Sequence, residues 1–251
     1  MDNAVLVLSD IVVAFGALRA VDGASLSVRQ GERRAVIGPN GAGKTTLFNA
    51  VTGVLTPTAG RIVFEGSDIT HAPPHRRARR GIARTFQITN LFPTLTVEEN
   101  LVLALRGQSR RKFSLFGRSG LDAAEDAEVA QALTLSRLSA RRATPVKELS
   151  YGEQRQLEMA LAVACKPRLL LLDEPAAGLS PGERSLVAEI IRSLPRELTV
   201  LLIEHDMDLA LGIVDYVTCL HEGRVLVEGV PAEIRGNAQV QEVYLGKPRH
   251  A

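Results

Sequence analysis

The chain contains 251 residues, of which 45% are hydrophobic and 23% are charged, and its formal net charge at pH 7 is +2. This length and composition are typical of a globular protein and exclude a fibrous or intrinsically disordered one. The small net charge and the aromatic content of 4% provide neither the strong positive field nor the stacking surfaces of a nucleic-acid-binding protein. We therefore expect no nucleic-acid partner.

Membrane insertion and export are not expected. The longest unbroken apolar run, Met159–Cys165, is far shorter than the roughly 20 residues that span a bilayer. The first residues show no basic region followed by an apolar stretch, so we expect no secretion signal and a location on the cytosolic side. The two cysteines, Cys165 and Cys219, lie in mostly apolar segments and complete no metal-ligand spacing, which favours small buried thiols.

Up to about residue 86, short β-rich runs alternate with turns that contain glycine. The strands expected here are Val5–Leu8, Ala24–Val28, Arg34–Ile37, Arg61–Phe64 and Ile82–Phe86. One helix is expected to begin at the glycine-rich segment Gly38–Lys44 and to run through Asn49. The N-terminal part is therefore predicted to be rich in β structure.

From about residue 88 to residue 165, apolar residues recur at three- and four-residue spacing, which predicts helices. The expected helices are Val97–Leu105, Ala123–Ser136 and Tyr151–Ala164. After Arg168, strands alternate with helices. The expected order is strand Leu169–Leu172, a helix opened by Ser180 and Pro181, strand Leu198–Ile203, a helix after His205, strands Asp215–Leu220 and Gly223–Glu228, and a terminal helical stretch, Pro231–Leu245. The alternation predicts an α/β fold with a parallel sheet, interrupted by a helical insert.

The segment between the third strand and the first helix fits the phosphate-loop pattern G-x-x-x-x-G-K-[ST]. Its residues are Gly38, Pro39, Asn40, Gly41, Ala42, Gly43, Lys44, Thr45 and Thr46. Glycines let successive backbone N–H groups face a phosphate, the helix N-terminus adds a partial positive charge, and Lys44 adds a full one. Thr45 would supply a hydroxyl for Mg²⁺. An ordinary glycine-rich turn is the alternative, but the complete motif in this context indicates nucleoside triphosphate binding.

Two adjacent carboxylates, Asp173 and Glu174, follow the apolar run Leu169–Leu172. Burying charge at the tip of an apolar strand is costly unless the charge is paired or binds a metal. Beside a phosphate loop, we expect Asp173 to hold Mg²⁺ and Glu174 to polarise the attacking water. A solvated strand end with a turn at Pro175 is the alternative. The acid at the second position favours a hydrolase over a protein that only binds nucleotide.

The segment Leu149–Gln154 leads into the helix that ends near Ala164. Ser150 and Glu153 have the spacing of a capping box, which starts a helix. A helix N-terminus with a serine hydroxyl and a glycine, here Gly152, also binds phosphate. Nothing in this segment limits it to the nucleotide of its own chain.

In their order along the chain, these motifs resemble the ATP-binding subunit of an ABC transporter. They are the phosphate loop, Gln87, Leu-Ser-Tyr-Gly-Glu, Leu-Leu-Leu-Leu-Asp-Glu-Pro and a histidine after the next strand. The resemblance covers essentially the whole chain and implies a P-loop NTPase core with an N-terminal antiparallel β subdomain and an inserted helical subdomain. A single domain, 1–251, is then expected, with its core at 1–87 and 166–251 and the helical insert at about 88–165.

The resemblance also implies roles for individual residues. Phe15 would stack on adenine, with a core phenylalanine as the alternative. Gln87 would help to hold Mg²⁺ and His205 would contact the γ-phosphate, with a solvated glutamine and a structural histidine as the alternatives. Ser150 and Gly152 would contact the γ-phosphate of ATP bound to the opposite protomer, so that each active site is complete only in a head-to-tail dimer.

Two positions depart from the usual family pattern. Tyr151 stands where the signature usually has glycine, which leaves Ser150 and Gly152 intact. Ser180 stands where the loop after the acidic pair usually ends in aspartate. Ser180 is suited to cap the next helix but cannot supply the carboxylate that helps communication across the dimer. We therefore expect hydrolysis and leave the coupling between the two sites open.

A narrower resemblance, to the ATPase subunits of branched-chain amino acid importers, rests on six places in the chain. They are Arg80–Gln87, Leu95–Leu101, Tyr151, Glu174–Pro181, Ile203–Met207 and Tyr244–Gly246. Relatives that handle urea, amides or aromatic acids look similar. The resemblance implies import of branched-chain or other amino acids and leaves the cargo open.

Two basic runs, Arg76–Arg80 and Arg106–Arg118, hold the densest positive charge. A solvated face is the expectation for both. The second run lies in the insert, which in the resembling family receives the coupling helices of the membrane subunits. Contact with anionic headgroups and a mobile loop are alternatives for the second run, whereas nucleic acid is disfavoured by the near-neutral overall charge.

The resemblance thus implies a Mg-dependent ATPase that binds ATP and energises uptake of amino acids. Its expected partners are transmembrane permease subunits, a second ATPase protomer that is identical or related, and, indirectly, a periplasmic or extracellular solute receptor. It is expected at the cytoplasmic face of the membrane, as a peripheral subunit. The alternatives are a soluble ABC-type ATPase that acts on ribosomes or nucleic acid, which the single cassette disfavours, and a regulatory module without turnover, which Glu174 and His205 disfavour.

Overall fold

The computed structural model describes residues 3–85, 91–108 and 122–245. Contacts within the chain divide it into two compact units. The sheet unit comprises residues 1–82, 168–174 and 195–251, and the helical unit comprises residues 83–167 and 175–194. Residues 175–194, which directly follow the acidic pair, thus group with the helical unit although they lie outside the expected insert.

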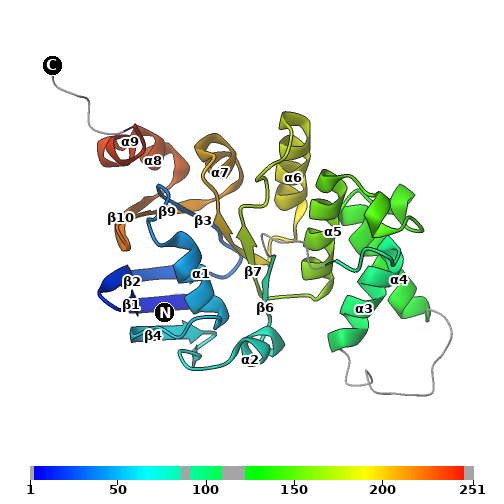
Figure 1. Cartoon of the computed structure of the whole chain (residues 1–251), viewed down its shortest axis with the longest axis horizontal. Coiled ribbons are helices and arrows are strands. Elements are labelled where there is room, and N and C mark those ends of the chain that lie inside the picture. The colour runs from blue at the N-terminus through cyan, green and yellow to red at the C-terminus, as the bar shows by residue number, and fades with distance from the viewer. Residues whose placement is uncertain (1–2, 86–90, 109–121, 246–251) are drawn as a thin grey trace. The chain divides into compact units, whose positions relative to one another are not determined.

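Four strands of the sheet unit form an antiparallel sheet near the N-terminus (Figure 1). They are β1 (Ala4–Phe15), β2 (Leu18–Arg29), β4 (Ala59–Phe64) and β5 (Ser67–Asp68), in the spatial order β2-β1-β4-β5. β1 and β2 are longer than the sequence predicts because they pair up to Phe15 and Leu18, where a tight hairpin turn joins them. The expected antiparallel β subdomain is confirmed.

Six strands form the second sheet, in the order β10-β9-β3-β8-β7-β6. They are β3 (Arg33–Ile37), β6 (Ile82–Arg84), β7 (Leu169–Asp173), β8 (Thr199–Ile203), β9 (Tyr216–His221) and β10 (Arg224–Gly229). Strands β3, β7 and β8 are parallel and buried along their whole length, as expected for a sheet covered on both faces. Cys219 of β9 is buried as predicted, whereas Cys165 is only partly buried. The expected α/β fold is confirmed.

Several helices pack within the sheet unit. They are α1 (Lys44–Thr52), α2 (Pro74–Arg79), α7 (Met207–Ile213), α8 (Pro231–Gly236) and α9 (Ala238–Leu245). The sequence predicts one helical stretch over Pro231–Leu245, but the chain forms two helices there. The Asn237 side chain accepts hydrogen bonds from the N–H groups of Gln239 and Val240 and so starts a new helix. Both helices lie beside β10 (Figure 1).

Helix α2 is absent from the sequence prediction. It begins at Pro74, directly after Pro73, and three of its six residues are arginines without apolar periodicity, so the pattern indicates a polar loop. The expectation that the whole run Arg76–Arg80 forms a solvated face is also wrong, because the Arg77 side chain is only 1% exposed.

The Arg77 guanidinium binds backbone carbonyl groups. It donates to the carbonyl oxygens of Ala50 (2.5 Å), Val51 (2.7 Å), Ala72 (2.8 Å) and Thr70 (2.9 Å). Burial lowers the pKa of Arg77 to about 10, which still leaves the side chain charged at pH 7. Ala50 and Val51 lie near the end of α1, so the charge sits at the negative end of that helix dipole.

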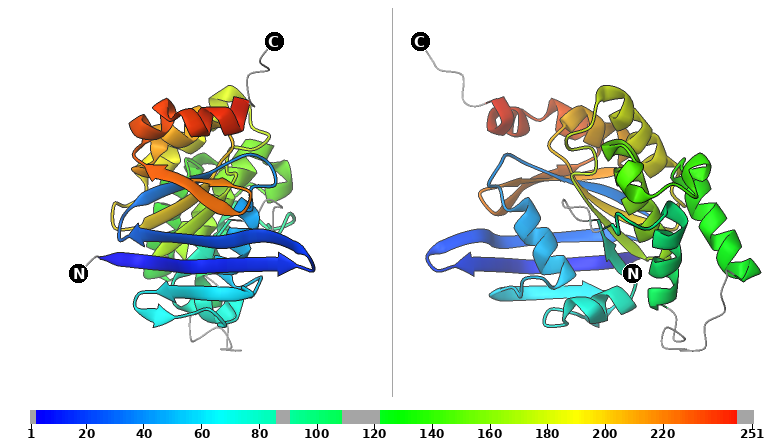
Figure 2. Two further views of the ribbon diagram at one scale, coloured as in Figure 1. Left: turned by 90° about the vertical axis from the view of Figure 1, so that its left-hand side faces the viewer. Right: turned by 45° about the vertical axis from the view of Figure 1, so that its right-hand side comes forward.

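The helical unit contains α3 (Val97–Gln108), α4 (Ala123–Leu135), α5 (Tyr151–Ala164) and α6 (Pro181–Ser193), with single 3-10 turns at Ser139–Arg141 and Val146–Glu148. Helices α3, α4 and α5 contact one another (Figure 2), and Leu101, Val129 and Leu157 contribute to their shared apolar core. The bounds of α5 are those that the sequence predicts. No helix in the described ranges combines the length and apolar character needed to cross a membrane.

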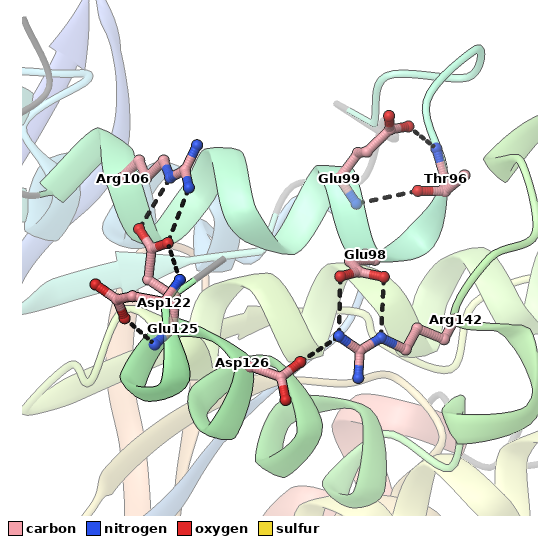
Figure 3. Close-up of polar contacts among 8 residues, drawn as sticks. All are labelled: Thr96, Glu98, Glu99, Arg106, Asp122, Glu125, Asp126 and Arg142. Atoms are coloured by element: carbon pink, nitrogen blue, oxygen red, sulfur yellow. Dashed lines mark hydrogen bonds and ion pairs between the residues drawn. The ribbon is translucent and has the colours of Figure 1, made fainter. Parts of the chain in front are cut away.

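Ion pairs join α3 to α4 at the surface of the helical unit (Figure 3). Arg142 donates through Nε and Nη2 to the two carboxylate oxygens of Glu98, at 2.9 Å each, and its Nη2 also pairs with Asp126. The hydrogen bonds from Arg142 lower the pKa of Glu98. Arg142 thus bridges carboxylates from two helices.

Arg106, the first residue of the second basic run, makes a similar contact. Its Nε and Nη2 donate to the two carboxylate oxygens of Glu125 at 2.9 and 2.8 Å (Figure 3). Arg106 is therefore paired with an acid rather than simply solvated. Residues 109–121, which hold most of the run, lie outside the described residues.

We expect Arg142→Gln to lower the free energy of unfolding by at most about 1 kcal/mol at pH 7, because the ion pairs are partly exposed. Arg142 lowers the pKa of Glu98 from 4.5, so its stabilisation is present above pH 4.5 and is lost as the pH falls through the lower pKa of the folded state. Urea unfolding at pH 7 and at progressively lower pH measures this difference. A difference in stability that does not shrink in acid would contradict the prediction.

Candidate active site

The phosphate loop follows β3 and ends in the first turn of α1. Gly38 and Gly43 have φ values of 148° and 97°, which favour glycine. A Cβ atom on Gly38 would lie 2.2 Å from the carbonyl oxygen of Leu220, and one on Gly43 would lie 2.3 Å from that of Ala20. Helix α1 has neither a side-chain cap nor an acidic residue in its first turn. The loop and helix end therefore suit an anionic ligand.

Lys44 lies across the phosphate loop. Its side chain is buried, and its Nζ donates to the carbonyl oxygens of Gly38 at 2.7 Å and Pro39 at 3.0 Å. Burial lowers the pKa of Lys44, while the nearby carboxylates of Glu174 and Asp173 act in the opposite direction. The ammonium group is thus held by loop carbonyls close to the acidic end of β7.

Thr45 and Asp173 carry oxygen donors of the type that Mg²⁺ prefers. Thr45 is exposed, whereas Asp173 is buried at the end of β7. Across the ranges that the structure describes, no three His, Cys, Asp or Glu side chains form a ready metal cluster. This donor set fits an ion that also binds phosphate oxygens and water, as Mg²⁺ does. Gln87, the other expected metal ligand, lies outside the described residues.

Glu174 and His205 lie together where β7 and β8 end. The Glu174 Oε1 atom is 3.3 Å from His205 Nδ1. The Glu174 backbone has φ of +49°, an uncommon conformation for a residue with a side chain, and its N–H donates to the Ile203 carbonyl oxygen at 3.0 Å. Such strained residues cluster at functional sites. The His205 side chain is 51% exposed and that of Glu174 is 19% exposed, so a ligand can reach part of both side chains.

Phe15 is exposed at the end of β1. Its exposed fraction of 51% excludes the alternative of a core phenylalanine. Leu18, its partner across the hairpin, is also exposed. An exposed aromatic ring of this kind is available to stack on a flat ligand.

Ser150 and Gly152 stand at the start of α5 in the helical unit. Ser150 Oγ accepts from the Glu153 N–H at 3.2 Å, and the Ser150 N–H donates to Glu153 Oε2 at 2.9 Å, which confirms the expected capping box. The Gly152 N–H donates to the carboxylate of Glu183. A Cβ atom on Gly152 would lie 2.3 Å from Glu183 Oε1. Ser180, as expected, caps α6 together with that same Glu183.

The structure therefore brings Lys44, Asp173, Glu174 and His205 into one part of the sheet unit. Sequence reasoning missed a contact of the phosphate loop: the Gly38 N–H donates to the hydroxyl oxygen of Tyr244 in α9 at 2.6 Å. The two residues are far apart in the sequence, so no local pattern reveals their contact. Sequence reasoning also missed that the Glu183 carboxylate of α6 accepts the N–H of Gly152 in α5.

Comparison with known proteins identifies the family. A family model described as ABC transporter matches residues 21–177, and one described as branched-chain amino acid ATP-binding cassette transporter matches residues 224–250. The high-affinity branched-chain amino acid transport ATP-binding protein BraF of Pseudomonas aeruginosa is 40% identical, over 98% of this chain and 100% of that protein. The LivG protein of Escherichia coli (strain K12), which has the same description, is 39% identical over the same shares of the two chains.

Solved structures agree with this assignment. An ATP-binding cassette of an ABC transporter in its ADP conformation is 32% identical, with a TM-score of 0.84 over 97% of this chain and 99% of that chain. A nucleotide-free cassette is also 32% identical, with a TM-score of 0.82 over 97% of this chain and 100% of that one. Sequence, fold and the phosphate loop followed by an acidic strand end all agree: the chain belongs to the ABC transporter family, as an ATP-binding cassette.

Proposed function

We propose that the chain is the Mg-dependent, ATP-hydrolysing subunit of an importer of branched-chain or related amino acids. The observation that carries the hydrolytic part is the Glu174–His205 contact beside the buried Lys44, at the ends of β7 and β8. The transport part is supported by relatives that are named as branched-chain amino acid transport proteins. Those names favour transport over action on ribosomes or nucleic acid.

Binding of ATP is assigned first to the phosphate loop. Its backbone N–H groups from Asn40 to Thr46 and the N-terminus of α1 bind the phosphates, and the Ala42 N–H, which donates to the Pro39 carbonyl oxygen at 3.2 Å, exchanges that partner for phosphate. Lys44 exchanges its contacts with the Gly38 and Pro39 carbonyls for phosphate oxygens. Phe15 stacks on the adenine. Thr45, Asp173 and Gln87 hold Mg²⁺, which neutralises charge on the phosphates.

Hydrolysis is assigned to the carboxylate and imidazole of the sheet unit. Glu174 orients a water molecule and accepts its proton while the water oxygen bonds to the γ-phosphorus and the bond to ADP breaks. His205, beside Glu174, contacts the γ-phosphate and stabilises the charge that develops there. Gln87 supports the same centre.

A second ATPase protomer, identical or related, completes each site in this proposal. Its Ser150 and Gly152 contact the γ-phosphate, so that ATP joins the two chains. For the Gly152 N–H to bind phosphate, the Glu183 carboxylate that now accepts from it has to move away. Closure of the dimer moves permease subunits, which receive substrate from a solute receptor outside the membrane, while the ATPase stays at the cytoplasmic face.

We expect Lys44→Ala to raise the Kd for Mg-ATP about 10- to 100-fold, because a charged hydrogen-bond donor to the phosphates is lost. The measurement is the rise in thermal unfolding temperature that Mg-ATP and Mg-ADP produce, with and without EDTA. Lys147→Ala, which removes an exposed lysine from the helical unit, is the matched control. Nucleotide stabilisation that is equal in both variants would contradict the assignment of Lys44.

The transport role has its own test. A tagged chain is purified from detergent-solubilised native membranes, with and without ATP, and the proteins that accompany it are identified by mass spectrometry. Recovery of polytopic membrane proteins supports the proposal, and the receptor encoded or purified with them indicates the cargo. Recovery of ribosomal or DNA-bound proteins without a permease would contradict the transport role and leave the ATPase chemistry standing.

A further inference from the structure

The C-terminal helix reaches the phosphate loop through one hydroxyl group. The oxygen of Tyr244 in α9 accepts the Gly38 N–H at 2.6 Å. Burial raises the pKa of Tyr244 to about 12, so the phenol is neutral at physiological pH. We propose that Tyr244 is a positioning residue that holds Gly38 in the conformation in which the phosphate loop binds nucleotide. This inference rests on the proposed nucleotide site.

The position of Tyr244 is set by packing. Its ring packs with Val240 of α9 against the apolar cluster that contains Ala35 and Ile37 of β3 and Cys219 of β9. These are the strand that leads into the loop and the strand beside it. The hydroxyl is therefore held at the strand-to-loop junction by contacts that do not depend on a ligand.

The Gly38 backbone depends on contacts from other residues to keep its conformation. Glycine has no side chain to restrict its rotation, and Gly38 has a φ of 148° and sits against the Leu220 carbonyl. Two side chains hold its polar groups: Tyr244 accepts from its N–H, and Lys44 Nζ donates to its carbonyl oxygen at 2.7 Å. When Lys44 turns to the phosphates, the Tyr244 hydroxyl is the side-chain contact that still holds Gly38.

Because Lys44 holds Gly38 only when no nucleotide is bound, loss of the Tyr244 hydroxyl is expected to affect the nucleotide-bound protein more than the free protein. Without nucleotide, Lys44 still restrains Gly38 through its carbonyl oxygen, so the stability of the free protein changes little and the effect is confined to the Gly38 amide, which has lost its acceptor. With nucleotide, Gly38 loses both contacts, and part of the binding energy is spent on ordering the loop. The C-terminal segment, matched by the branched-chain amino acid transporter model, thereby acts on the nucleotide site of the same chain.

The test is Tyr244→Phe in the full chain, which keeps the ring and removes the hydroxyl. We expect the Kd for Mg-ADP to rise about five- to tenfold, the ratio given by one ordinary hydrogen bond. We also expect faster hydrogen exchange at the Gly38 amide in the ADP-bound protein. Tyr216→Phe is the matched control, since it removes the hydroxyl of a tyrosine on β9 whose ring lies under Arg34 and leaves the loop untouched.

Three results would overturn the inference. One is a Kd and a Gly38 exchange rate equal to those of the natural chain. Another is a fall in unfolding temperature without nucleotide, together with faster exchange throughout the sheet unit, because Tyr244 would then support the fold and not the loop. The third is an equal effect of Tyr216→Phe. If the natural chain binds no ADP, the proposed function fails. Faster exchange confined to the Gly38 amide of the free Tyr244→Phe chain would then support the positioning role, and unchanged exchange would overturn it.

Discussion

Glu174→Gln is expected to lower the rate of ATP hydrolysis by about 10²- to 10⁴-fold, the usual contribution of a general base. Glutamine has nearly the shape of glutamate but cannot accept the proton of the attacking water. It keeps an oxygen or nitrogen near His205 Nδ1, which lies 3.3 Å from Glu174 Oε1, so the site should remain ordered. The measurement is phosphate release by the ATPase assembled with its membrane partners.

Two comparisons make this result specific. Binding of Mg-ATP by Glu174→Gln should stay close to that of the natural chain, and dimers formed with ATP should persist because hydrolysis no longer separates them. Glu197→Gln makes the same chemical change at an exposed position that precedes β8, at the opposite end of that strand from His205, and should hydrolyse ATP normally. Near-normal turnover by Glu174→Gln would falsify the role of Glu174 as the base.

Arg77→Ala is expected to lower the free energy of unfolding by about 3 to 5 kcal/mol, because several hydrogen bonds from a charged donor, each contributing about 1.5 to 3 kcal/mol, and the packing of a buried side chain are lost. The loss is large because the buried guanidinium donates to four backbone carbonyls, two of them near the C-terminal end of α1. Those carbonyls would lose their donors in a place that water enters poorly. Thermal and urea unfolding of the purified chain measure the change.

The neighbouring arginine provides the control. Arg76 lies on the same short helix and is exposed, so Arg76→Ala should change the free energy of unfolding by less than about 0.5 kcal/mol. Both variants remove one positive charge and the same side-chain atoms, and they differ in that Arg77 is buried whereas Arg76 is exposed. Equal stability of the two variants would show that the carbonyl contacts of Arg77 contribute little.

Local sequence patterns predict elements whose stability is local. The bounds of α5 follow from apolar spacing and from the Ser150–Glu153 capping box, both of which lie within one segment. The phosphate loop and the acidic end of β7 are similarly evident, because glycines before a helix and carboxylates after an apolar strand have few other uses. Family resemblance then supplied His205, whose contact with Glu174 the structure shows.

Elements defined by distant contacts could not be predicted in this way. Helix α2 has no apolar face by which the sequence could predict it. In the sequence, Arg77 does not differ from the exposed arginines beside it, and only the structure shows its contact with the carbonyls of α1. The contacts of Tyr244 with Gly38 and of Glu183 with Gly152 join residues from different elements. They depend on the completed packing of each unit, which no window of the sequence contains.

The position of β3 in the sheet affects how the chain folds during its synthesis on the ribosome. Its neighbours in the sheet are β8 and β9, which end at Ile203 and His221, so β3 has no strand partner until the ribosome has reached the last part of the chain. Until then the backbone N–H and C=O groups along both edges of β3 are unpaired and open to the wrong strands, and pairing over so long a stretch is slow. The phosphate loop directly follows this strand, so we expect the nascent chain to bind nucleotide only after β8 and β9 have been synthesised. Until then we expect chaperones to bind the unpaired strand.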